Sequence, residues 1–373
     1  MEAAVEIPAD VAGSFRIEQA VESGDVSRLS GGRTNRTMWV RGAEEADELV
    51  LQQLRGDANS DLLGVMENLV RVTAHLDWKQ RVRRDPNTWW PLLVPTTAGK
   101  PFLMTDDGDV WRAFVYRPGR IARSALPHET LVGAATLFGR FSAETVDLGD
   151  PDLMMSTPGF HDLDLVWTEF ESLIDAADRE AAAPLLKWGD RIDAVRRELD
   201  RRMHDDGLNT VRHRVVHNDT KLSNVLLEQG GPEPIAVLDL DLAMMGPIWH
   251  DVGDLLRSAA WHSAVDGEPK MTPELFGAMT HGWCQAAAAS TTASEVATFA
   301  TAGPRLSLEL GVRYLSDHLR QVPVLRVEGE DGHLRRGLAN VKLAEEMLGA
   351  YDALRSLVDE CVDLHHPNFK VHE

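Results

Sequence analysis

The 373-residue chain has little of what several classes of protein need. Its two cysteines, Cys284 and Cys361, do not support a disulfide framework, so a reducing cytoplasm is the expected setting. No run of about 18 apolar residues occurs, and residues 1–15 lack the basic stretch and apolar core of a signal peptide. We therefore expect a cytoplasmic protein without a membrane span.

Positive charge is also scarce, since 38 Lys and Arg residues face 59 Asp and Glu residues and give a net charge of -21. Such an acidic chain is not expected to bind nucleic acid or an anionic membrane surface. The hydrophobic content of 43% and charged content of 26% are those of an ordinary globular protein, long enough for two domains or one bilobed unit. A small molecule is the expected partner, with no obligate protein partner.

The most informative feature is a set of polar residues around a predicted β-hairpin. Asp219 is followed five residues later by Asn224 and fifteen residues after that by Asp239. Two apolar runs, 225–227 and 235–238, flank a turn-rich segment, so the open ends of the hairpin bring Asn224 and Asp239 together. This spacing is typical of a kinase catalytic loop followed by a metal-binding aspartate.

Phosphoryl transfer uses these residue types directly. Asp219 is the predicted catalytic base, which positions the acceptor hydroxyl and takes its proton late, and Asn224 and Asp239 are the predicted Mg²⁺ ligands. Asp241 is either a further metal ligand or a polar residue at the strand end. Lys221 is predicted to neutralise charge on the moving group. The alternatives are a helix N-cap for Asp219 and a solvated surface lysine for Lys221.

The segments HNDTKLSNVLL (217–227) and VLDLDLAMMGPIWHDVGDLLR (237–257) resemble the aminoglycoside phosphotransferase and choline kinase superfamily. Within it, the chain is most similar to the bacterial N-acetylhexosamine kinases, over roughly residues 20 to 350. The segments that carry this closer likeness are LVLQQL (49–54), VMENLVRVTAHL (65–76), WRAFVYRPG (111–119), FGRFSAETVDL (138–148), TPGFHDLD (157–164) and LELGVRYLSDHL (308–319).

The expected fold is α+β and bilobed. Residues 1–116 combine strand patterns with a helical period over 61–78 and are predicted to form a β-rich nucleotide-binding lobe. Residues 117–373 are predicted to form a mainly helical catalytic and acceptor-binding lobe. The resemblance implies a protein-kinase-like architecture with ATP in the cleft between the lobes. Other helices are expected at 14–22, 128–145, 161–175, 178–203, 250–263, 272–290, 293–320 and 335–361.

Nucleotide-binding residues are expected in the N-terminal lobe. The loop at 30–36 either covers the phosphates with backbone N–H groups or is a plain hairpin turn. Residues near 113–119 are the predicted hinge, where backbone groups would bind the adenine edge. The candidates are Ser30, Gly31, Gly32, Arg33, Gln52, Glu67, Phe114 and Tyr116.

One position departs from the usual kinase pattern. Kinases carry a lysine on the third strand, paired with a glutamate on the next helix, whereas this chain has Gln52 there and Glu67 at the helix position. The N-acetylhexosamine kinase pattern also carries glutamine at that place. An amide can donate a hydrogen bond to phosphate but brings no charge, so Arg33, Arg36 or Lys221 would have to compensate.

The acceptor is expected to contact two polar pairs, His161 with Asp162 and Arg313 with Asp317. Sugar hydroxyls favour carboxylates and planar donors in a polar pocket. Both pairs are equally suited to polar contacts between helices. Trp261 could stack on a sugar ring, although core packing is the ordinary fate of a tryptophan.

The sequence therefore predicts an ATP- and Mg²⁺-dependent kinase that phosphorylates a hydroxyl of an amino sugar, with N-acetylglucosamine or another N-acetylhexosamine as the first candidate. Aminoglycoside, choline and homoserine are alternative acceptors, and the anomeric and 6-hydroxyl groups are both open. The missing lysine also raises the alternative of a catalytically inactive nucleotide-binding module. A protein kinase is disfavoured because only twelve positions separate Asp239 from Asp251.

Overall fold

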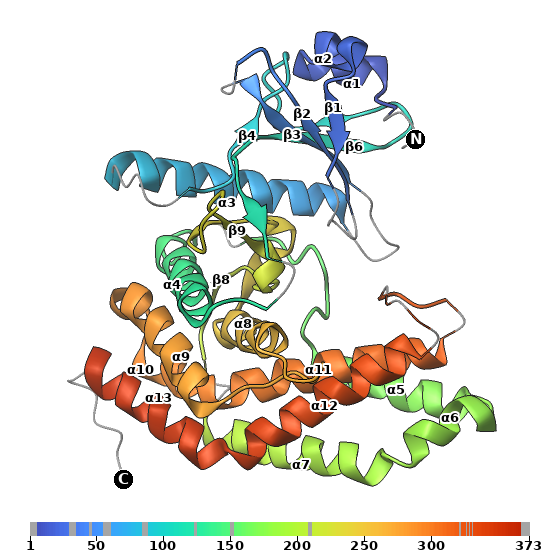
Figure 1. Cartoon of the computed structure of the whole chain (residues 1–373), viewed down its shortest axis with the longest axis vertical. Coiled ribbons are helices and arrows are strands. Elements are labelled where there is room, and N and C mark those ends of the chain that lie inside the picture. The colour runs from blue at the N-terminus through green and yellow to red at the C-terminus, as the bar shows by residue number, and fades with distance from the viewer. Residues whose placement is uncertain are drawn as a thin grey trace.

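A smaller, sheet-containing lobe lies above a larger helical lobe in the computed structural model (Figure 1). This is the bilobed, kinase-like arrangement that the sequence predicts. The predicted division of the chain after Tyr116 stays a prediction. The structure describes residues 6–29, 35–44, 47–54, 61–83, 89–122, 125–149, 153–207, 211–320, 322–325, 327, 329 and 331–366.

The N-terminal lobe contains an antiparallel sheet in the order β1-β2-β3-β6-β4, with β5 paired to β6. Successive side chains of a strand point to opposite faces. Leu51 and Trp111 therefore pack with the apolar residues of α1, whereas Gln52 and Arg112 lie on the other face. The strands are β1 (Val26–Arg28), β2 (Arg36–Val40), β3 (Leu49–Leu54), β4 (Leu93–Val94), β5 (Leu103–Met104) and β6 (Val110–Val115).

Helix α3 (Leu62–Arg83) confirms the helical period predicted for 61–78, and it buries Met66, Leu69 and Leu76. The helix predicted at 14–22 is instead two short helices, α1 (Ala9–Phe15) and α2 (Glu18–Ser23). The break lies at Arg16, whose φ of 56° is left-handed and ends α1.

The predicted hairpin forms between β9 (Val225–Leu227) and β10 (Pro234–Val237), and β7 (Arg120–Ile121) adds to its edge. The chain enters β7 through Gly119, where a Cβ atom would come within 2.7 Å of Leu226. A second ribbon pairs β8 (His213–Val216) with β11 (Met244–Pro247). The two ribbons hold the 3₁₀ turns η3 (Leu222–Asn224) and η4 (Leu240–Leu242) at the junction of the lobes.

Helix α8 lies at the centre of the C-terminal lobe and packs against α11 (Figure 1). Three helices predicted as continuous are each broken in two, at 187–188, at Thr298 and at Ala350. The helices are α4 (His128–Glu144), α5 (Leu163–Ala176), α6 (Arg179–Leu186), α7 (Gly189–Asp205), α8 (Trp249–His262), α9 (Pro273–Ala287), α10 (Ala293–Ala297), α11 (Phe299–Leu319), α12 (Gly332–Gly349) and α13 (Tyr351–His365), with the 3₁₀ turn η5 (Ala288–Ser290).

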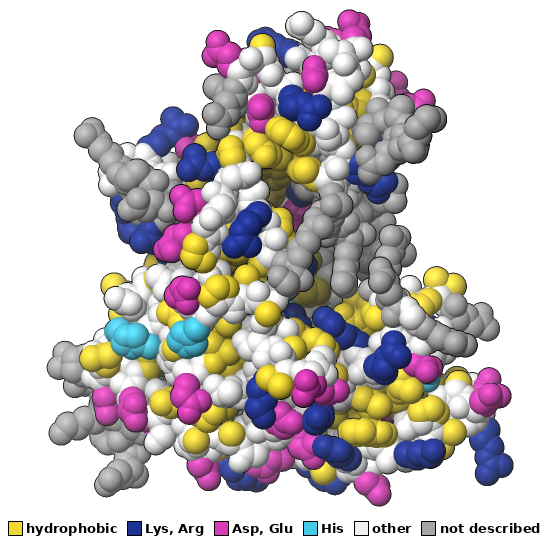
Figure 2. Space-filling view, viewed as in Figure 1, with side chains coloured by type: hydrophobic (Ala, Val, Ile, Leu, Met, Phe, Trp, Pro, Cys, Tyr) yellow, Lys and Arg dark blue, Asp and Glu magenta, His cyan; other side chains and the backbone are white. Residues whose placement is uncertain are grey.

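The molecule narrows between the two lobes, and acidic and basic side chains are interspersed on the face drawn in Figure 2. None of the helices in the described part of the chain combines the length and the apolar character that crossing a membrane requires.

Candidate active site

The catalytic loop is held by the first turn of α8. The Asp251 carboxylate accepts hydrogen bonds from the backbone N–H groups of His217, at 2.9 Å, and Asn218, at 2.7 Å. Asn218 has a φ of 63°, a conformation that asparagine tolerates better than most residues. The Thr220 hydroxyl donates to the Asp251 carbonyl at 2.6 Å. Asp251 therefore fixes the loop.

Asp219 lies within this loop beside two of the predicted residues. The Asn224 side-chain amide donates to its carboxylate at 2.9 Å and to its backbone carbonyl at 2.8 Å. The Lys221 ammonium pairs with the same carboxylate. Burial alone would raise the pKa of Asp219, but the charge and hydrogen bonds of Lys221 hold it below its ordinary value. The carboxylate is therefore ionised at neutral pH and ready to orient a hydroxyl donor.

Asp239 joins this cluster from the hairpin. The Leu238 N–H donates to the Asn224 carbonyl at 2.8 Å, and Asp239 itself is left-handed with a φ of 61°. Desolvation and repulsion from Asp241 and Asp219 raise the pKa of Asp239 to about 6. Because the side chain is exposed to solvent, repulsion is the stronger of the two causes, and a bound cation would relieve it.

The residues fit a divalent ion that is shared with a ligand. Among the described residues, no group of three or more His, Cys, Asp or Glu side chains is arranged to hold a metal. An ion here would rely on the Asn224 amide oxygen, the Asp239 carboxylate and oxygen atoms of the substrate. Mg²⁺ is commonly held in this way, by one or two carboxylates plus phosphates.

Asp241 faces the sheet. Its carboxylate pairs with Arg112 of β6 at 2.6 Å and accepts a hydrogen bond from the Asn35 side chain at 2.9 Å. A further role of Asp241 as a metal ligand stays a prediction. Arg112, which the sequence did not single out, stands directly opposite Gln52 in the β3–β6 ladder. It could have been identified only if the pairing of β3 with β6 had been predicted from their residue patterns.

Gln52 contacts Arg112 and Thr37, and no contact joins it to Glu67 among the described residues. Gln52 accepts a hydrogen bond from Arg112 at 2.9 Å and donates to the Thr37 hydroxyl at 3.1 Å. Glu67 is exposed, and its neighbour Met66 lies 3.7 Å from the Arg112 guanidinium. This corrects the placement of Glu67 beside the third strand, because one residue changes the facing side of a helix by about 100°.

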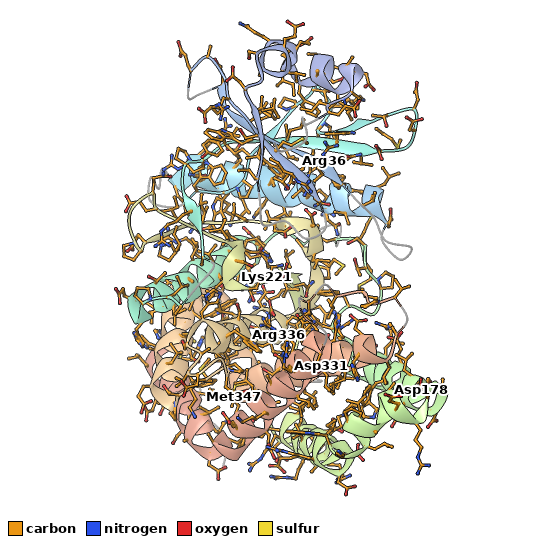
Figure 3. The ribbon with its side chains drawn as sticks, turned by 45° about the vertical axis from the view of Figure 1, so that its right-hand side comes forward. Arg36, Asp178, Lys221, Asp331, Arg336 and Met347 are labelled. Atoms are coloured by element: carbon orange, nitrogen blue, oxygen red, sulfur yellow. The ribbon has the colours of Figure 1, made fainter. Side chains whose placement is uncertain are left out.

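The predicted hinge residues Phe114 and Tyr116 both have contacts through their aromatic rings. The Arg112 guanidinium sits over the Phe114 ring at 5.1 Å. Tyr116 stacks on Trp39 with ring centroids 5.0 Å apart. Figure 3 shows Lys221 on the part of the helical lobe that faces the sheet, with Arg36 on the sheet above it. The predicted phosphate loop residues Ser30, Gly31, Gly32 and Arg33 lie outside the described residues.

The family model described as the phosphotransferase enzyme family matches residues 25–290. The chain belongs to this phosphotransferase family. Solved structures show the same fold at low sequence identity. They include an aminoglycoside phosphotransferase from Alicyclobacillus acidocaldarius (17% identity, TM-score 0.66, covering 96% of this chain and 98% of that one). An ethanolamine kinase from Plasmodium vivax is 12% identical (TM-score 0.55; 87% and 83% covered). An amicoumacin kinase solved with AMP-PNP and Ca²⁺ is 14% identical (TM-score 0.55; 91% and 96% covered).

In this phosphotransferase His161, one of the predicted acceptor residues, braces the catalytic loop. One ring nitrogen lies 3.0 Å from the Asn218 carbonyl and the other 3.1 Å from the Glu309 carboxylate. Arg313 contacts the same carboxylate at 3.2 Å. Burial would raise the pKa of Glu309, but His161, Arg305 and Arg313 hold it well below its usual range. The structure thus brings His161 and Arg313 together, around Glu309.

The two predicted acceptor carboxylates have structural contacts. Asp162 caps α5 by accepting from the Leu165 N–H at 3.0 Å, and its role toward an acceptor stays a prediction. The Asp317 side chain is 0% exposed and accepts from Arg320 and from the Val324 and Leu325 N–H groups. This corrects the expectation that Asp317 faces a sugar, because the carboxylate holds the segment after α11 instead.

Two further charged residues near the catalytic loop, Asp254 and Arg257, were not predicted as site residues. They form a buried ion pair at 2.5 Å on α8. Asp254 is a charge neighbour of Lys221, and Arg257 of Asp219. One Asp254 oxygen is buried without a hydrogen-bond partner among the described groups. Asp254 follows Asp251 by three residues and Arg257 follows Asp254 by three, so each side chain is a helix-surface neighbour of the one before it. This spacing was the available signal.

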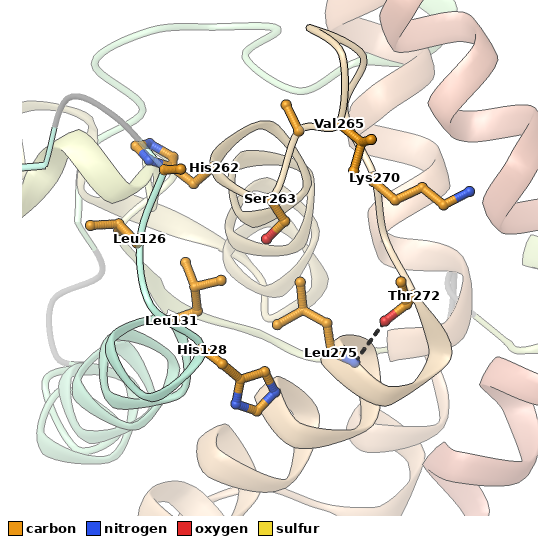
Figure 4. A pocket seen from close by; sticks show the side chains of 11 residues that line it. Leu126, His128, Leu131, His262, Ser263, Val265, Lys270, Thr272 and Leu275 are labelled. Carbon is orange, nitrogen blue, oxygen red and sulfur yellow. Dashed lines mark hydrogen bonds between the residues drawn. The ribbon is translucent and has the colours of Figure 1, made fainter.

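A cleft of 380 Å³ lies elsewhere, between the start of α4 and the end of α8, where Leu126, His128, His262 and Leu275 are among its lining (Figure 4). His262 follows Asp251 by eleven helical residues, a distance of about 16 Å at 1.5 Å per residue. None of the predicted site residues lines this cleft. This cleft is therefore separate from the cluster of predicted site residues.

Proposed function

We propose that this phosphotransferase uses ATP and Mg²⁺ to phosphorylate a hydroxyl of an amino sugar, with N-acetylhexosamines as the first acceptors to test. The observation that carries the proposal is the cluster of Asp219, Lys221 and Asn224, fixed by Asp251 and placed beside Asp239. AMP-PNP and Ca²⁺ bound to the amicoumacin kinase of the same fold support a nucleotide and a divalent ion as partners.

The Asp219 carboxylate accepts a hydrogen bond from the acceptor hydroxyl and thereby orients the hydroxyl oxygen toward the γ-phosphorus. As the new O–P bond forms, the bond from the γ-phosphorus to the β–γ bridging oxygen breaks and ADP departs. The hydroxyl proton passes late to the Asp219 carboxylate, as suits a base with a low pKa. Lys221 stabilises the charge on the moving group. Asn224 and Asp239 would hold the Mg²⁺ ion, which supplies neutralisation of phosphate charge.

The amino-sugar acceptor is supported by the pair of Asp254 and Arg257. A guanidinium provides several donors in a fixed geometry, and the unpartnered carboxylate oxygen provides an acceptor, which together suit a molecule carrying hydroxyl and amide groups. The same oxygen equally suits an ammonium group. A kinase for a small amino alcohol is therefore the second candidate, in keeping with the ethanolamine kinase of the same fold.

The test is ATP consumption over a panel of N-acetylglucosamine, N-acetylgalactosamine, glucosamine, ethanolamine, choline, homoserine and an aminoglycoside. Turnover with an N-acetylhexosamine, lost in Asp219→Asn, supports the proposal. Phosphorus NMR of the product then identifies the phosphorylated hydroxyl through its coupling to ring protons. Turnover with ethanolamine, choline or homoserine alone supports the second candidate, a kinase for a small amino alcohol. ADP binding without turnover on any acceptor contradicts both.

Asp254→Asn separates the two acceptor classes. The variant keeps the shape of the side chain and removes its charge. It should therefore weaken the binding of an ammonium acceptor far more than the binding of a neutral N-acetylated acceptor. Asp193→Asn, an exposed position on α7, is the matched control. An equal loss for both classes would mean that Asp254 does not contact the nitrogen group.

A further inference from the structure

The cleft-side face of the N-terminal sheet carries a buried cation one strand away from the place where kinases usually carry it. Gln52 of β3 and Arg112 of β6 are paired directly in the antiparallel ladder, so their side chains emerge on the same face. The Arg112 side chain is only 2% exposed. A buried guanidinium is costly unless its N–H groups and its charge are matched.

Arg112 is matched on three sides. Its Nε donates to the Gln52 side chain at 2.9 Å, and its first terminal nitrogen lies 3.7 Å from the Met66 sulfur. Its second terminal nitrogen forms an ion pair with Asp241 at 2.6 Å that lacks hydrogen-bond geometry. Gln52 is itself oriented by the Thr37 hydroxyl at 3.1 Å. The planar fork of arginine can satisfy a neutral acceptor and a carboxylate together, which the point charge of a lysine cannot.

The Arg112–Asp241 pair also links the two lobes. Arg112 belongs to the sheet, whereas Asp241 lies in η4, two residues after the predicted metal ligand Asp239. Asn35 at the start of β2 holds the second Asp241 oxygen at 2.9 Å. Two residues of the N-terminal lobe therefore fix a carboxylate of the metal-binding segment, and no glutamate of α3 takes part in these contacts.

We propose that Arg112 supplies the positive charge that Gln52 lacks, and that it acts as a positioning residue by fixing Asp241, and with it segment 239–241, for binding of the metal–nucleotide. The proposal rests on the proposed use of ATP and Mg²⁺. In this arrangement Gln52 orients Arg112. Contacts from Gln52 on β3 to Arg112 on β6, and from Arg112 to Asp241 in η4, stand in place of the lysine–glutamate ion pair between strand and helix of other kinases.

A double-mutant cycle tests the connection. ADP affinity is measured by calorimetry, with Mg²⁺ and with EDTA, for the wild type, Arg112→Met, Asp241→Asn and the double variant. Each single change should weaken Mg²⁺–ADP binding about 10- to 100-fold, the usual range for residues that orient metal ligands. The double variant should bind Mg²⁺–ADP no more weakly than the weaker-binding of the two single variants, because Arg112 acts through Asp241. Metal-free affinity should change less than about threefold.

The outcomes are distinct. If Arg112→Met binds Mg²⁺–ADP as tightly as the wild type does, the proposal is overturned. Additive losses, with an equal fall in metal-free affinity, also overturn it, since Arg112 would then contact the phosphates directly. If the wild type itself binds no Mg²⁺–ADP, the proposed function fails first. Arg41→Met is the matched control in the same lobe, since Arg41 contacts Trp39 and Asp25, and it should retain wild-type affinity.

Two further variants keep the test decisive if Arg112→Met does not fold. Arg112→Lys retains the charge but cannot span Gln52 and Asp241 together, so Mg²⁺–ADP binding should weaken about tenfold. Unchanged affinity would contradict the proposal. Gln52→Lys combined with Arg112→Gln moves the cation back to β3 but gives Asp241 no forked partner, so it should not recover the Mg²⁺–ADP affinity that Arg112→Gln alone loses. Full recovery would contradict the proposal, because charge alone and not the fixing of Asp241 would then be what the site requires.

Discussion

The two sides of the lobe junction hold their charged residues in different ways. On the helical side, Asp251 grips the catalytic loop through two backbone N–H groups, and His161 adds a contact to the Asn218 carbonyl. On the sheet side, the contacts of the Asp241 carboxylate with described residues are to the side chains of Arg112 and Asn35. Backbone contacts fix a loop with little freedom, whereas side-chain contacts can rearrange. Chemistry should therefore depend on the helical side and metal–nucleotide affinity on the sheet side.

The largest effect is expected from Asp219→Asn. An amide keeps the size of the side chain and cannot take the acceptor proton, so kcat should fall about 10²- to 10⁴-fold. Mg²⁺–ADP affinity should stay near the wild-type value. Steady-state kinetics and calorimetry on the same preparation check both. A variant that loses nucleotide affinity and turnover in parallel would remove the contrast between the two sides.

The next largest effect is expected from removing the Asp251 carboxylate, which holds the catalytic loop. Asp251→Ala leaves two buried N–H groups of the catalytic loop without their carboxylate, which costs about 3 kcal/mol or more of folding stability. Urea unfolding measures the loss. Asp251→Asn, which retains one acceptor oxygen, should lose clearly less stability. Equal stability of Asp251→Ala and the wild type would show that the loop does not depend on α8.

The cluster around Glu309 gives a pH-dependent effect. Because the pKa of Glu309 is depressed in the folded protein, its ion pairs contribute stability above the unfolded value, near 4.5, and lose it as pH falls toward the folded value. The difference in unfolding free energy between the wild type and Glu309→Gln should be largest at neutral pH. It should shrink steadily below about pH 4.5. A constant difference would contradict the depressed pKa.

The smallest effect is expected away from the junction. The Arg191 side chain is 45% exposed and pairs with Glu345 on the surface of the helical lobe. Arg191→Ala should change the unfolding free energy by less than about 1 kcal/mol and leave turnover unchanged. The same urea titration measures it. A change as large as that of Asp251→Ala would mean that surface pairs matter as much as the brace.

The same contrast explains what the sequence could predict. Asp219, Lys221 and Asn224 lie within six positions, and a hairpin of β-forming residues connects them to Asp239, so spacing alone indicates their chemistry. The Asp254–Arg257 pair was also within reach, because Asp254 follows Asp251 by three helical residues and Arg257 follows Asp254 by the same spacing.

Other features depend on tertiary contacts that no local pattern shows. The partnership of Arg112 and Asp241 arises only when the sheet docks on η4. The exposed position of Glu67 follows from the rotation of α3, which the burial of Met66 fixes. Helix breaks at Arg16 and Thr298 occur where the residue types themselves permit a continuous helix, so neighbouring elements decide them.

The most direct measurement of the central claim is ADP binding with and without Mg²⁺ to the wild type and to Asp239→Asn. The wild type should bind ADP at least about tenfold more tightly with Mg²⁺, and Asp239→Asn should lose this gain while keeping its metal-free affinity. ADP binding that ignores Mg²⁺ in the wild type, or a full Mg²⁺ gain in Asp239→Asn, would contradict a metal held between Asn224 and Asp239.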